Sequence, residues 1–201
     1  SQQKAIDKYI NKENIFITGP GGSGKSAVIR KIVEHADKTG IRYQVCGLTG
    51  CASVLLKCGA KTLHSWSGIG LGKGAIEIVS HKVAANKYKR NNWRNVDLLI
   101  IDEVSMLRAD LLDCIDHMLR YLRKRKDVPF GGAQILFIGD LLQLPPVVKD
   151  DEWNILKSYY NSSYFFEARA LSAASLIHVE LEEIYRQSDD QFIAILNRFR
   201  E

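Results

Sequence analysis

The sequence has little of what marks a secreted or membrane protein. Its four cysteines include no CxxC pair, and three of them lie in or beside apolar runs, which favours buried free thiols. No apolar run approaches the roughly 18 residues of a membrane span, and the N-terminus has no signal-peptide pattern. We therefore expect no membrane contact and an intracellular, reducing compartment: the cytoplasm of a bacterium, or the nucleus or a mitochondrion of a eukaryote.

Internal repeats and low-complexity segments are also absent, and the charge is only modestly one-sided. The 201 residues are 46% hydrophobic and 25% charged, which suits one globular domain, or one domain with an insertion. The formal net charge of +5 suits a polyanionic partner but favours nucleic acid only slightly. The chain begins at Ser1 without a methionine and stops at Glu201 inside a helical pattern, so we expect it to be a piece of a longer polypeptide.

Short apolar runs that suit buried strands alternate along the chain with amphipathic patterns that suit helices. The predicted strands are residues 14–18, 42–47, 97–101, 134–138 and 176–181, and the predicted helices are residues 2–12, 25–39, 51–58, 110–125 and 189–200. Residues 62–74 are rich in glycine and predict a loop, and residues 75–90 predict a basic segment that is helical or irregular. The alternation predicts an α/β fold with a mostly parallel central sheet and helices on both faces.

Residues 19–26, Gly-Pro-Gly-Gly-Ser-Gly-Lys-Ser, match the phosphate-binding pattern GxxxxGK[ST] in full. The glycines let successive backbone N–H groups curl around an anion, and the helix that starts here directs its positive end at the phosphates. Lys25 would reach the β- and γ-phosphates, and Ser26 would bind Mg²⁺. A glycine-rich turn without a ligand is disfavoured, because a strand precedes the motif and a helix follows it. The predicted nucleotide-binding residues are Gly19, Gly21, Gly22, Ser23, Gly24, Lys25 and Ser26.

A carboxylate pair, Asp102 and Glu103, follows the apolar run 98–101. The carboxyl ends of the strands in an open α/β sheet are where ligands bind. Asp102 would hold Mg²⁺, directly or through water, and Glu103 would position and deprotonate the attacking water. The alternative, an acidic pair that caps a helix, is disfavoured by the complete phosphate loop upstream. The pair therefore predicts a hydrolase.

Two further polar residues follow predicted strands. Gln143 lies in the run Gly-Asp-Leu-Leu-Gln-Leu-Pro-Pro after residues 134–138, where it could touch the γ-phosphate or the water and report hydrolysis to a neighbouring loop. Taken alone, this run predicts only a turn stiffened by proline. Arg186 follows the last predicted strand, where it could stabilise charge on the transferring phosphoryl group. Taken alone, Arg186 suits a surface salt bridge better.

Together these residues resemble the Pif family of superfamily 1 DNA helicases across nearly the whole chain. The signatures Asp-Glu-Val-Ser-Met and Gln-Leu-Pro-Pro are specific in combination, and a Thr-Leu-His-Ser-Trp run and a Phe-Phe-Glu-Ala segment separate Pif from RecD-type helicases. The matching segments are residues 2–5 (glutamine motif), 19–26 (motif I), 49–52 (motif Ia), 62–72 (the Thr-Leu-His-Ser run), 102–106 (motif II), 139–146 (motif III), 165–168 and 185–187 (motif IV).

The resemblance implies a RecA-like P-loop NTPase fold with ATP and Mg²⁺ as cofactors. It implies 5′-to-3′ movement on single-stranded DNA and, as processes, DNA repair, DNA recombination and telomere maintenance. Gln2 would recognise adenine, Gln143 would couple nucleotide state to DNA, and Arg186 would be an arginine finger. The single-stranded DNA path would be lined by Thr49, Gly50, His64 and Ser65.

The sequence departs from the family pattern in two ways. Gly47-Leu48 replaces the usual Ala-Pro or Ala-Ser, and Ser53 replaces an alanine, which suggests shifted DNA contacts with unchanged ATP chemistry. The chain also ends before motifs V and VI, so residues 1–201 would be the first motor domain without the second. We expect this piece alone, as a monomer, to bind ATP weakly, hydrolyse it slowly and unwind nothing.

Basic residues gather in two stretches. The first, residues 82–94, interleaves lysines and arginines with Tyr88 and Trp93, which suits single-stranded nucleic acid about as well as a solvated face. With the preceding loop it would form an insertion, residues 62–96, that extends toward DNA. The second stretch, residues 120–126, closes a helix and suits a plain surface role. Three alternative functions stay open: a RecD-type helicase or exonuclease subunit, a small-molecule kinase, and an ATP-binding module without catalytic activity.

Overall fold

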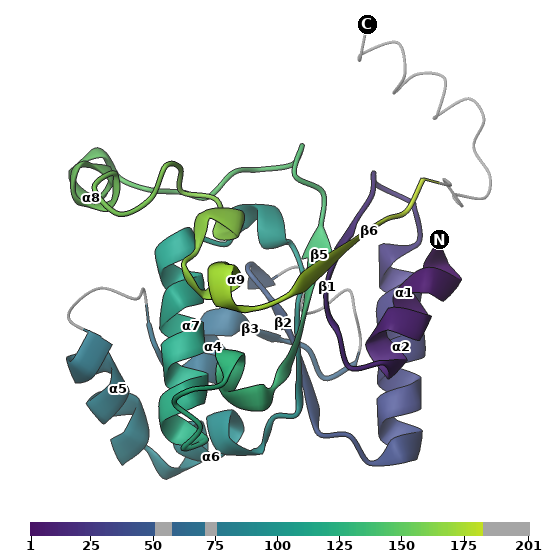
Figure 1. Ribbon diagram of the computed structural model, residues 1–201, viewed down its shortest axis with the longest axis horizontal. Coiled ribbons are helices and arrows are strands. Elements are labelled where there is room, and N and C mark those ends of the chain that lie inside the picture. Colours follow the sequence, from purple (N-terminus) through teal and green to yellow (C-terminus); the bar gives the residue numbers. More distant parts are fainter. Residues whose placement is uncertain (51–57, 71–75, 183–201) are drawn as a thin grey trace, which may run out of the picture.

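A six-stranded sheet forms the centre of the molecule, and every strand pairing in it is parallel. The computed structural model describes residues 1–50, 58–70 and 76–182. The strand order is β3-β2-β4-β5-β1-β6 (Figure 1). The strands are β1 (Asn14–Thr18), β2 (Tyr43–Gly47), β3 (Lys61–Thr62), β4 (Leu98–Ile101), β5 (Gln134–Gly139) and β6 (Leu176–Glu180). The predicted parallel sheet is therefore confirmed, and β3 is a strand that the sequence did not indicate.

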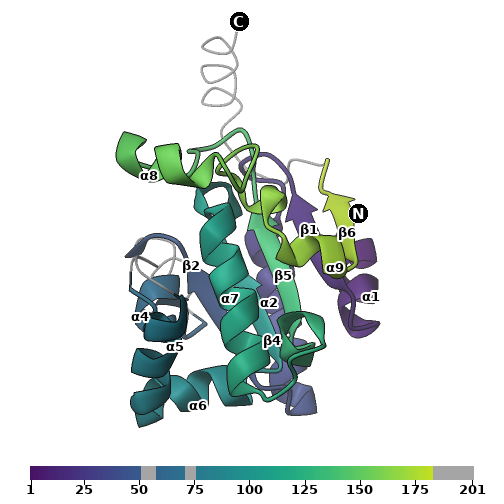
Figure 2. The ribbon, with the colours of Figure 1, turned by 60° about the vertical axis from the view of Figure 1, so that its left-hand side comes forward.

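Helices cover both faces of the sheet, as the sequence predicted (Figures 1 and 2). The helices are α1 (Gln2–Ile10), α2 (Lys25–Thr39), α4 (Leu63–Ser67), α5 (Ile76–Ala85), α6 (Lys87–Asn95), α7 (Ala109–Leu122), α8 (Asp150–Leu156) and α9 (Ala170–Ala173). Figure 2 shows α7 in front of the sheet and α2 behind it. The predicted helices 51–58 and 189–200 lie almost wholly or wholly outside the described residues.

Alternate residues of β1, β4 and β5 enter two separate cores. Ile15 and Ile17 of β1 pack in the core that α1 and α2 cover, whereas Phe16 packs in the core beneath α7. This division follows from the two-residue repeat of a strand, which directs successive side chains to opposite faces. The continuous apolar runs that predicted buried strands therefore reflect a sheet with a core on each side.

The stretch 62–74 was predicted to be a loop, and the structure shows that this was wrong for its first part. Thr62 closes β3 and then caps α4, because its hydroxyl oxygen accepts a hydrogen bond from the Ser65 N–H at 3.1 Å. Leu63 and Trp66, three residues apart, are both buried. The high glycine content obscured this short amphipathic turn, whose cap and apolar spacing are ordinary helix signals. Residues 71–74 lie outside the described residues.

Trp93 of α6 joins α6 to α4 within the segment between β3 and β4, and it belongs to the core cluster beneath α7. Its side chain is fully buried, its indole N–H donates to the Ser67 carbonyl at 2.8 Å, and its ring lies 4.8 Å from that of Trp66. Whether residues 62–96 extend toward DNA stays a prediction. The structure shows that helices α4, α5 and α6 form most of this segment.

Replacing Trp93 with alanine should therefore loosen the whole segment. We expect a loss of about 3–5 kcal/mol in the free energy of unfolding, because a large buried ring and its hydrogen bond are removed together. Tyr88→Ala on the same helix is the matched control, since Tyr88 is 58% exposed, and it should change stability little. Equal effects of the two substitutions in urea denaturation would contradict this assignment.

Among the described residues, no helix has both the length and the apolar character that crossing a bilayer requires. Three cysteines, Cys46, Cys58 and Cys114, are free thiols, and Cys51 lies outside the described residues. Burial raises the pKa of the Cys114 thiol to about 11. The prediction of buried free thiols is thus confirmed for Cys46 and Cys114, while Cys58 is half-buried.

Candidate nucleotide-binding site

The phosphate loop joins the end of β1 to the start of α2, at the carboxyl edge of the sheet. Because β1, β5 and β4 are parallel neighbours, their carboxyl ends meet at this edge. Asp140 follows β5, and Asp102 and Glu103 follow β4. The strand order therefore confirms the prediction that the phosphate loop and the carboxylate pair lie at the same edge of the sheet.

Lys25 occupies the centre of this edge. Its ammonium donates hydrogen bonds to the carbonyls of Gly19 at 2.5 Å and Pro20 at 2.9 Å. Burial lowers the pKa of Lys25, and the nearby charges of Asp140 and Asp102 oppose that effect. Sequence reasoning placed Asp140 in a motif but gave it no role. Its signal was the position directly after a buried strand, the same signal that identified Asp102.

The phosphate loop is closely packed where it leaves β1. A Cβ atom on Gly19 would lie 2.5 Å from the Ser23 hydroxyl and 2.7 Å from the Leu181 carbonyl, both too short for any side chain. Ser23 itself is buried, and its N–H donates to the Pro20 carbonyl at 3.1 Å. Gly21 and Ser26, by contrast, are exposed. The loop is therefore a compact turn that presents its outer positions and the start of α2 to a ligand.

Asp102 lies next to Lys25 and is mostly buried. Burial raises the pKa of the Asp102 carboxyl, while a hydrogen bond from the Glu103 N–H at 2.8 Å and the charge of Lys25 lower it. With the exposed Ser26 hydroxyl, this carboxylate makes a sparse set of hard oxygen donors. Mg²⁺ typically takes one or two such protein ligands together with substrate phosphates and waters. The donor set fits Mg²⁺ bound with a nucleotide.

Glu103 is held from two sides. Its side-chain Oε2 accepts hydrogen bonds from the Thr49 N–H at 3.1 Å and the Thr49 hydroxyl at 2.9 Å. Its backbone adopts the left-handed conformation, with φ of 56°, which is uncommon for a residue with a Cβ atom. Thr49 was predicted to line the DNA path, and sequence reasoning missed its contact with Glu103. Only the pairing of β2 with β4 brings the two residues together.

Gln143 reaches the same edge from the segment after β5. It lines a pocket of about 550 Å³ together with Glu103, Met106 and Pro145. Gln143 is exposed, and the neighbouring side chains of Leu142 and Leu144 are 95% and 69% exposed. The structure therefore places a polar side chain and exposed apolar side chains beside Glu103, and the coupling role of Gln143 stays a prediction.

The remaining predicted residues lie around this centre. Gln2 is half-buried at the start of α1, and both ribbon views show the N-terminus beside the end of β6 (Figures 1 and 2). His64 of α4 lines a pocket of about 280 Å³ with Leu48 and Arg108, and its Nδ1 is buried without a hydrogen-bond partner among the described residues. Gly50 and Ser65 are exposed. Arg186 lies outside the described residues.

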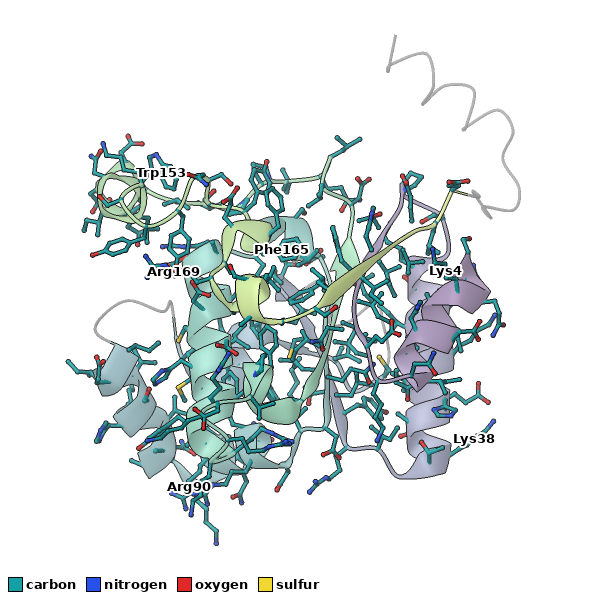
Figure 3. All side chains as sticks on the ribbon, viewed as in Figure 1. Lys4, Lys38, Arg90, Trp153, Phe165 and Arg169 are labelled. Carbon is teal, nitrogen blue, oxygen red and sulfur yellow. The ribbon has the colours of Figure 1, made fainter. Side chains whose placement is uncertain are left out.

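The two basic stretches meet on the surface. Arg90 and Arg94 of α6 line a pocket of about 460 Å³ with Lys124 and Lys126, which follow α7. Figure 3 shows Arg90 at the opposite end of the molecule from the carboxyl edge of the sheet. Lys89, by contrast, donates to the Ser65 carbonyl. The first stretch is thus divided, and only part of it lies beside the predicted DNA residues.

The sheet order, the phosphate loop and the carboxylate pair define a RecA-like P-loop NTPase domain. Within that class, the chain belongs to the PIF1-like helicase family, whose family model matches residues 1–200. The ATP-dependent DNA helicase RRM3 of Saccharomyces cerevisiae is 36% identical over 202 residues, which cover 99% of this chain and 27% of that protein.

Solved structures of Pif1 helicases show the same fold. The crystal structure from Candida albicans matches with a TM-score of 0.84 and 35% identity, covering 100% of this chain and 43% of that one. The Bacteroides Pif1 helicase in complex with ADP-AlF3 and ssDNA matches with a TM-score of 0.81 and 36% identity, covering 99% of this chain and 45% of that one. The chain therefore spans less than a third of the curated relative and less than half of each solved chain.

Proposed function

We propose that this chain is the nucleotide-binding motor domain of an ATP-dependent DNA helicase that moves 5′ to 3′ on single-stranded DNA. One observation carries the proposal: Lys25, the Asp102–Glu103 pair and Gln143 converge at the carboxyl edge of the sheet. This set combines a phosphate-binding cation, a metal-binding carboxylate, a base and a coupling residue.

Lys25 would bind the phosphates of ATP. In the structure its ammonium donates to two carbonyls of its own loop, and phosphate oxygens are stronger acceptors for a cationic donor. The partly buried ammonium would stabilise the charge that develops during transfer, because its field is only weakly screened there. The positive end of α2 acts in the same direction.

Ser26 and Asp102 would hold Mg²⁺, which neutralises phosphate charge when it is bound. Glu103 would orient the attacking water and accept its proton, since its carboxylate follows directly after Asp102. Gln143 shares a pocket with Glu103 and would sense the γ-phosphate or the water. Gln2, beside the phosphate-loop edge, would recognise the adenine.

A second motor domain of the same polypeptide would complete the site. Leu142, Leu144 and Val147 are 95%, 69% and 77% exposed, and clustered exposed apolar side chains commonly mark a surface that another domain covers. They follow the strand that ends beside the phosphate loop. Arg186 would contribute an arginine finger to the same closed site. Closure around ATP would then depend on bound DNA.

Single-stranded DNA would run past Thr49, Gly50, His64 and Ser65. The supporting observations are the exposed Gly50 and Ser65 and the buried His64 nitrogen without a partner among the described residues. Thr49 lies between this path and Glu103, which gives DNA a direct route to the hydrolytic residue. Participation in repair, recombination or telomere maintenance, and the compartment, stay predictions that follow from this activity.

The proposal predicts that the full-length polypeptide hydrolyses ATP at least about tenfold faster with single-stranded DNA than without it. It also predicts that the protein separates the strands of duplexes with a 5′ single-stranded tail but not of duplexes with a 3′ tail, because the motor would load on the 5′ tail. Steady-state ATPase assays with and without an oligonucleotide, followed by unwinding assays on 5′-tailed and 3′-tailed duplexes, measure both. Phosphate transfer to a metabolite without DNA stimulation would instead indicate a kinase.

A further inference from the structure

One residue, Thr49, both contacts the candidate catalytic base Glu103 and belongs to the predicted DNA path. The Thr49 N–H and hydroxyl both donate to the same oxygen of Glu103, at 3.1 and 2.9 Å. Thr49 follows β2 by two residues, and β2 pairs with β4, which ends next to Asp102. The Asp102 N–H donates to the Cys46 carbonyl at 2.8 Å, so the two strand ends are held in register. The contact between Thr49 and Glu103 is therefore built into the sheet.

The backbone of Glu103 leaves little freedom for any rearrangement except rotation of its side chain. Its N–H donates to Asp102 Oδ1 at 2.8 Å, and the chain after it passes close to β5. A Cβ atom on Gly139 would lie only 3.0 Å from the Val104 nitrogen, so β5 supports this turn directly. A switch at Glu103 would thus consist of a change of side-chain rotamer on a fixed backbone.

We propose that Thr49 is a positioning residue that holds Glu103 in a resting orientation, and that a DNA phosphate releases it. This inference rests on the proposed function, in which the Thr49 segment lies along the DNA. Backbone N–H and threonine hydroxyl groups are common donors to DNA phosphates. A phosphate oxygen that accepts from the Thr49 hydroxyl takes that donor from Glu103.

The released carboxylate then turns toward the water at the γ-phosphate. While Oε2 accepts two hydrogen bonds from Thr49, both of its lone-pair directions are engaged, and the carboxylate is held against the segment that follows β2. DNA and Glu103 thus compete for one donor, and hydrolysis without DNA is suppressed because Thr49 then holds the carboxylate. The opposite role, a brace that aligns Glu103 for catalysis, would be broken by the DNA that is expected to stimulate the enzyme.

The test is the ATPase rate of the full-length protein with Thr49→Val, which removes the hydroxyl and keeps the shape. We expect the DNA-free kcat to rise about tenfold, because a charge-assisted hydrogen bond that favours the resting state is lost. The kcat at saturating single-stranded DNA should change less than about twofold, and KM for ATP should not change, since Thr49 is not one of the residues proposed to bind the nucleotide. The ratio of stimulated to basal kcat falls accordingly.

Two variants make the result specific. Thr49→Ser restores the hydroxyl and should return the DNA-free kcat to the wild-type value. Thr39→Val is the matched control, because within the described part of the chain the Thr39 hydroxyl bonds only to the α2 carbonyls of His35 and Ala36. It should leave both rates unchanged. Thermal melting confirms that each variant is folded, and Thr49→Ala replaces Thr49→Val if the latter is not.

A DNA-free kcat that is unchanged or lower in folded Thr49→Val would overturn the proposal, and a lower value would identify Thr49 as a brace. This measurement, the kcat of Thr49→Val without DNA, does not depend on whether the protein binds DNA. If the wild-type enzyme shows no stimulation by DNA at all, the proposed helicase function fails, whereas a raised DNA-free kcat in Thr49→Val would still support the hold on Glu103.

Discussion

Replacing Lys25 with alanine should reduce DNA-stimulated ATP hydrolysis by the full-length protein by about 10²- to 10³-fold. The ammonium is partly buried among the loop carbonyls and close to Asp102 and Asp140. In the proposed site it is therefore the cation that would meet the phosphates, in a poorly screened position. Steady-state ATPase rates at saturating single-stranded DNA measure the effect, and binding of a fluorescent ATP analogue shows how much of it is lost affinity.

Lys38→Ala is the control for this substitution. Lys38 lies on the same helix, α2, but at its far end from the phosphate loop (Figure 3), where it forms an exposed ion pair with Glu34 at 2.7 Å. Its loss should leave the ATPase rate unchanged, because an exposed pair of this kind contributes little. Wild-type turnover in Lys25→Ala would exclude residues 19–26 as the phosphate site.

Glu103→Gln should lower kcat by about 10²- to 10⁴-fold while ATP still binds. The substitution removes the group that accepts the proton from water, but the amide oxygen can still accept the hydrogen bonds from Thr49. The substitution therefore shows the effect of losing the base alone, while the hydrogen bonds that hold the side chain to Thr49 are kept. Single-turnover hydrolysis and nucleotide binding, measured on the same preparation, distinguish a chemical defect from a binding defect.

Glu34→Gln provides the matched change on the exposed surface of α2 and should have no effect on kcat. A Glu103→Gln enzyme that hydrolyses ATP at the wild-type rate would show that another group activates the water. Asp140 would then be the first residue to test, because its charge acts on Lys25 as that of Asp102 does.

Local patterns in the sequence were enough to predict most of the sheet and the centre of the site. The apolar runs that became β1, β4 and β5 have cores on both sides, so their composition alone marks them as buried. Residues 19–26 and the Asp102–Glu103 pair are each defined by contiguous residues. A phosphate loop is formed by neighbouring backbone groups, so its chemistry can be read without knowledge of the fold.

Features that depend on contacts between distant segments were missed or misjudged. The segment 62–67 was predicted as a loop because glycine content outweighed a threonine cap and two buried side chains. Asp140 received no role, although it follows a buried strand as Asp102 does, and the adjacency of β5 and β1 places its charge near Lys25. The two basic stretches were treated as separate surfaces, although α6 and α7 bring Arg90 and Lys124 to one pocket.

The sequence by itself determined that this protein has a P-loop, a carboxylate pair directly after an apolar strand and an α/β fold, and its motifs indicated the helicase family. These depend on short runs of residues whose chemistry is local. Only the tertiary structure decided which residues meet. The parallel pairing of β2 with β4 places Thr49 against Glu103, fifty-four positions along the chain. No local pattern records such a contact, because strand order follows from the packing of the whole sheet.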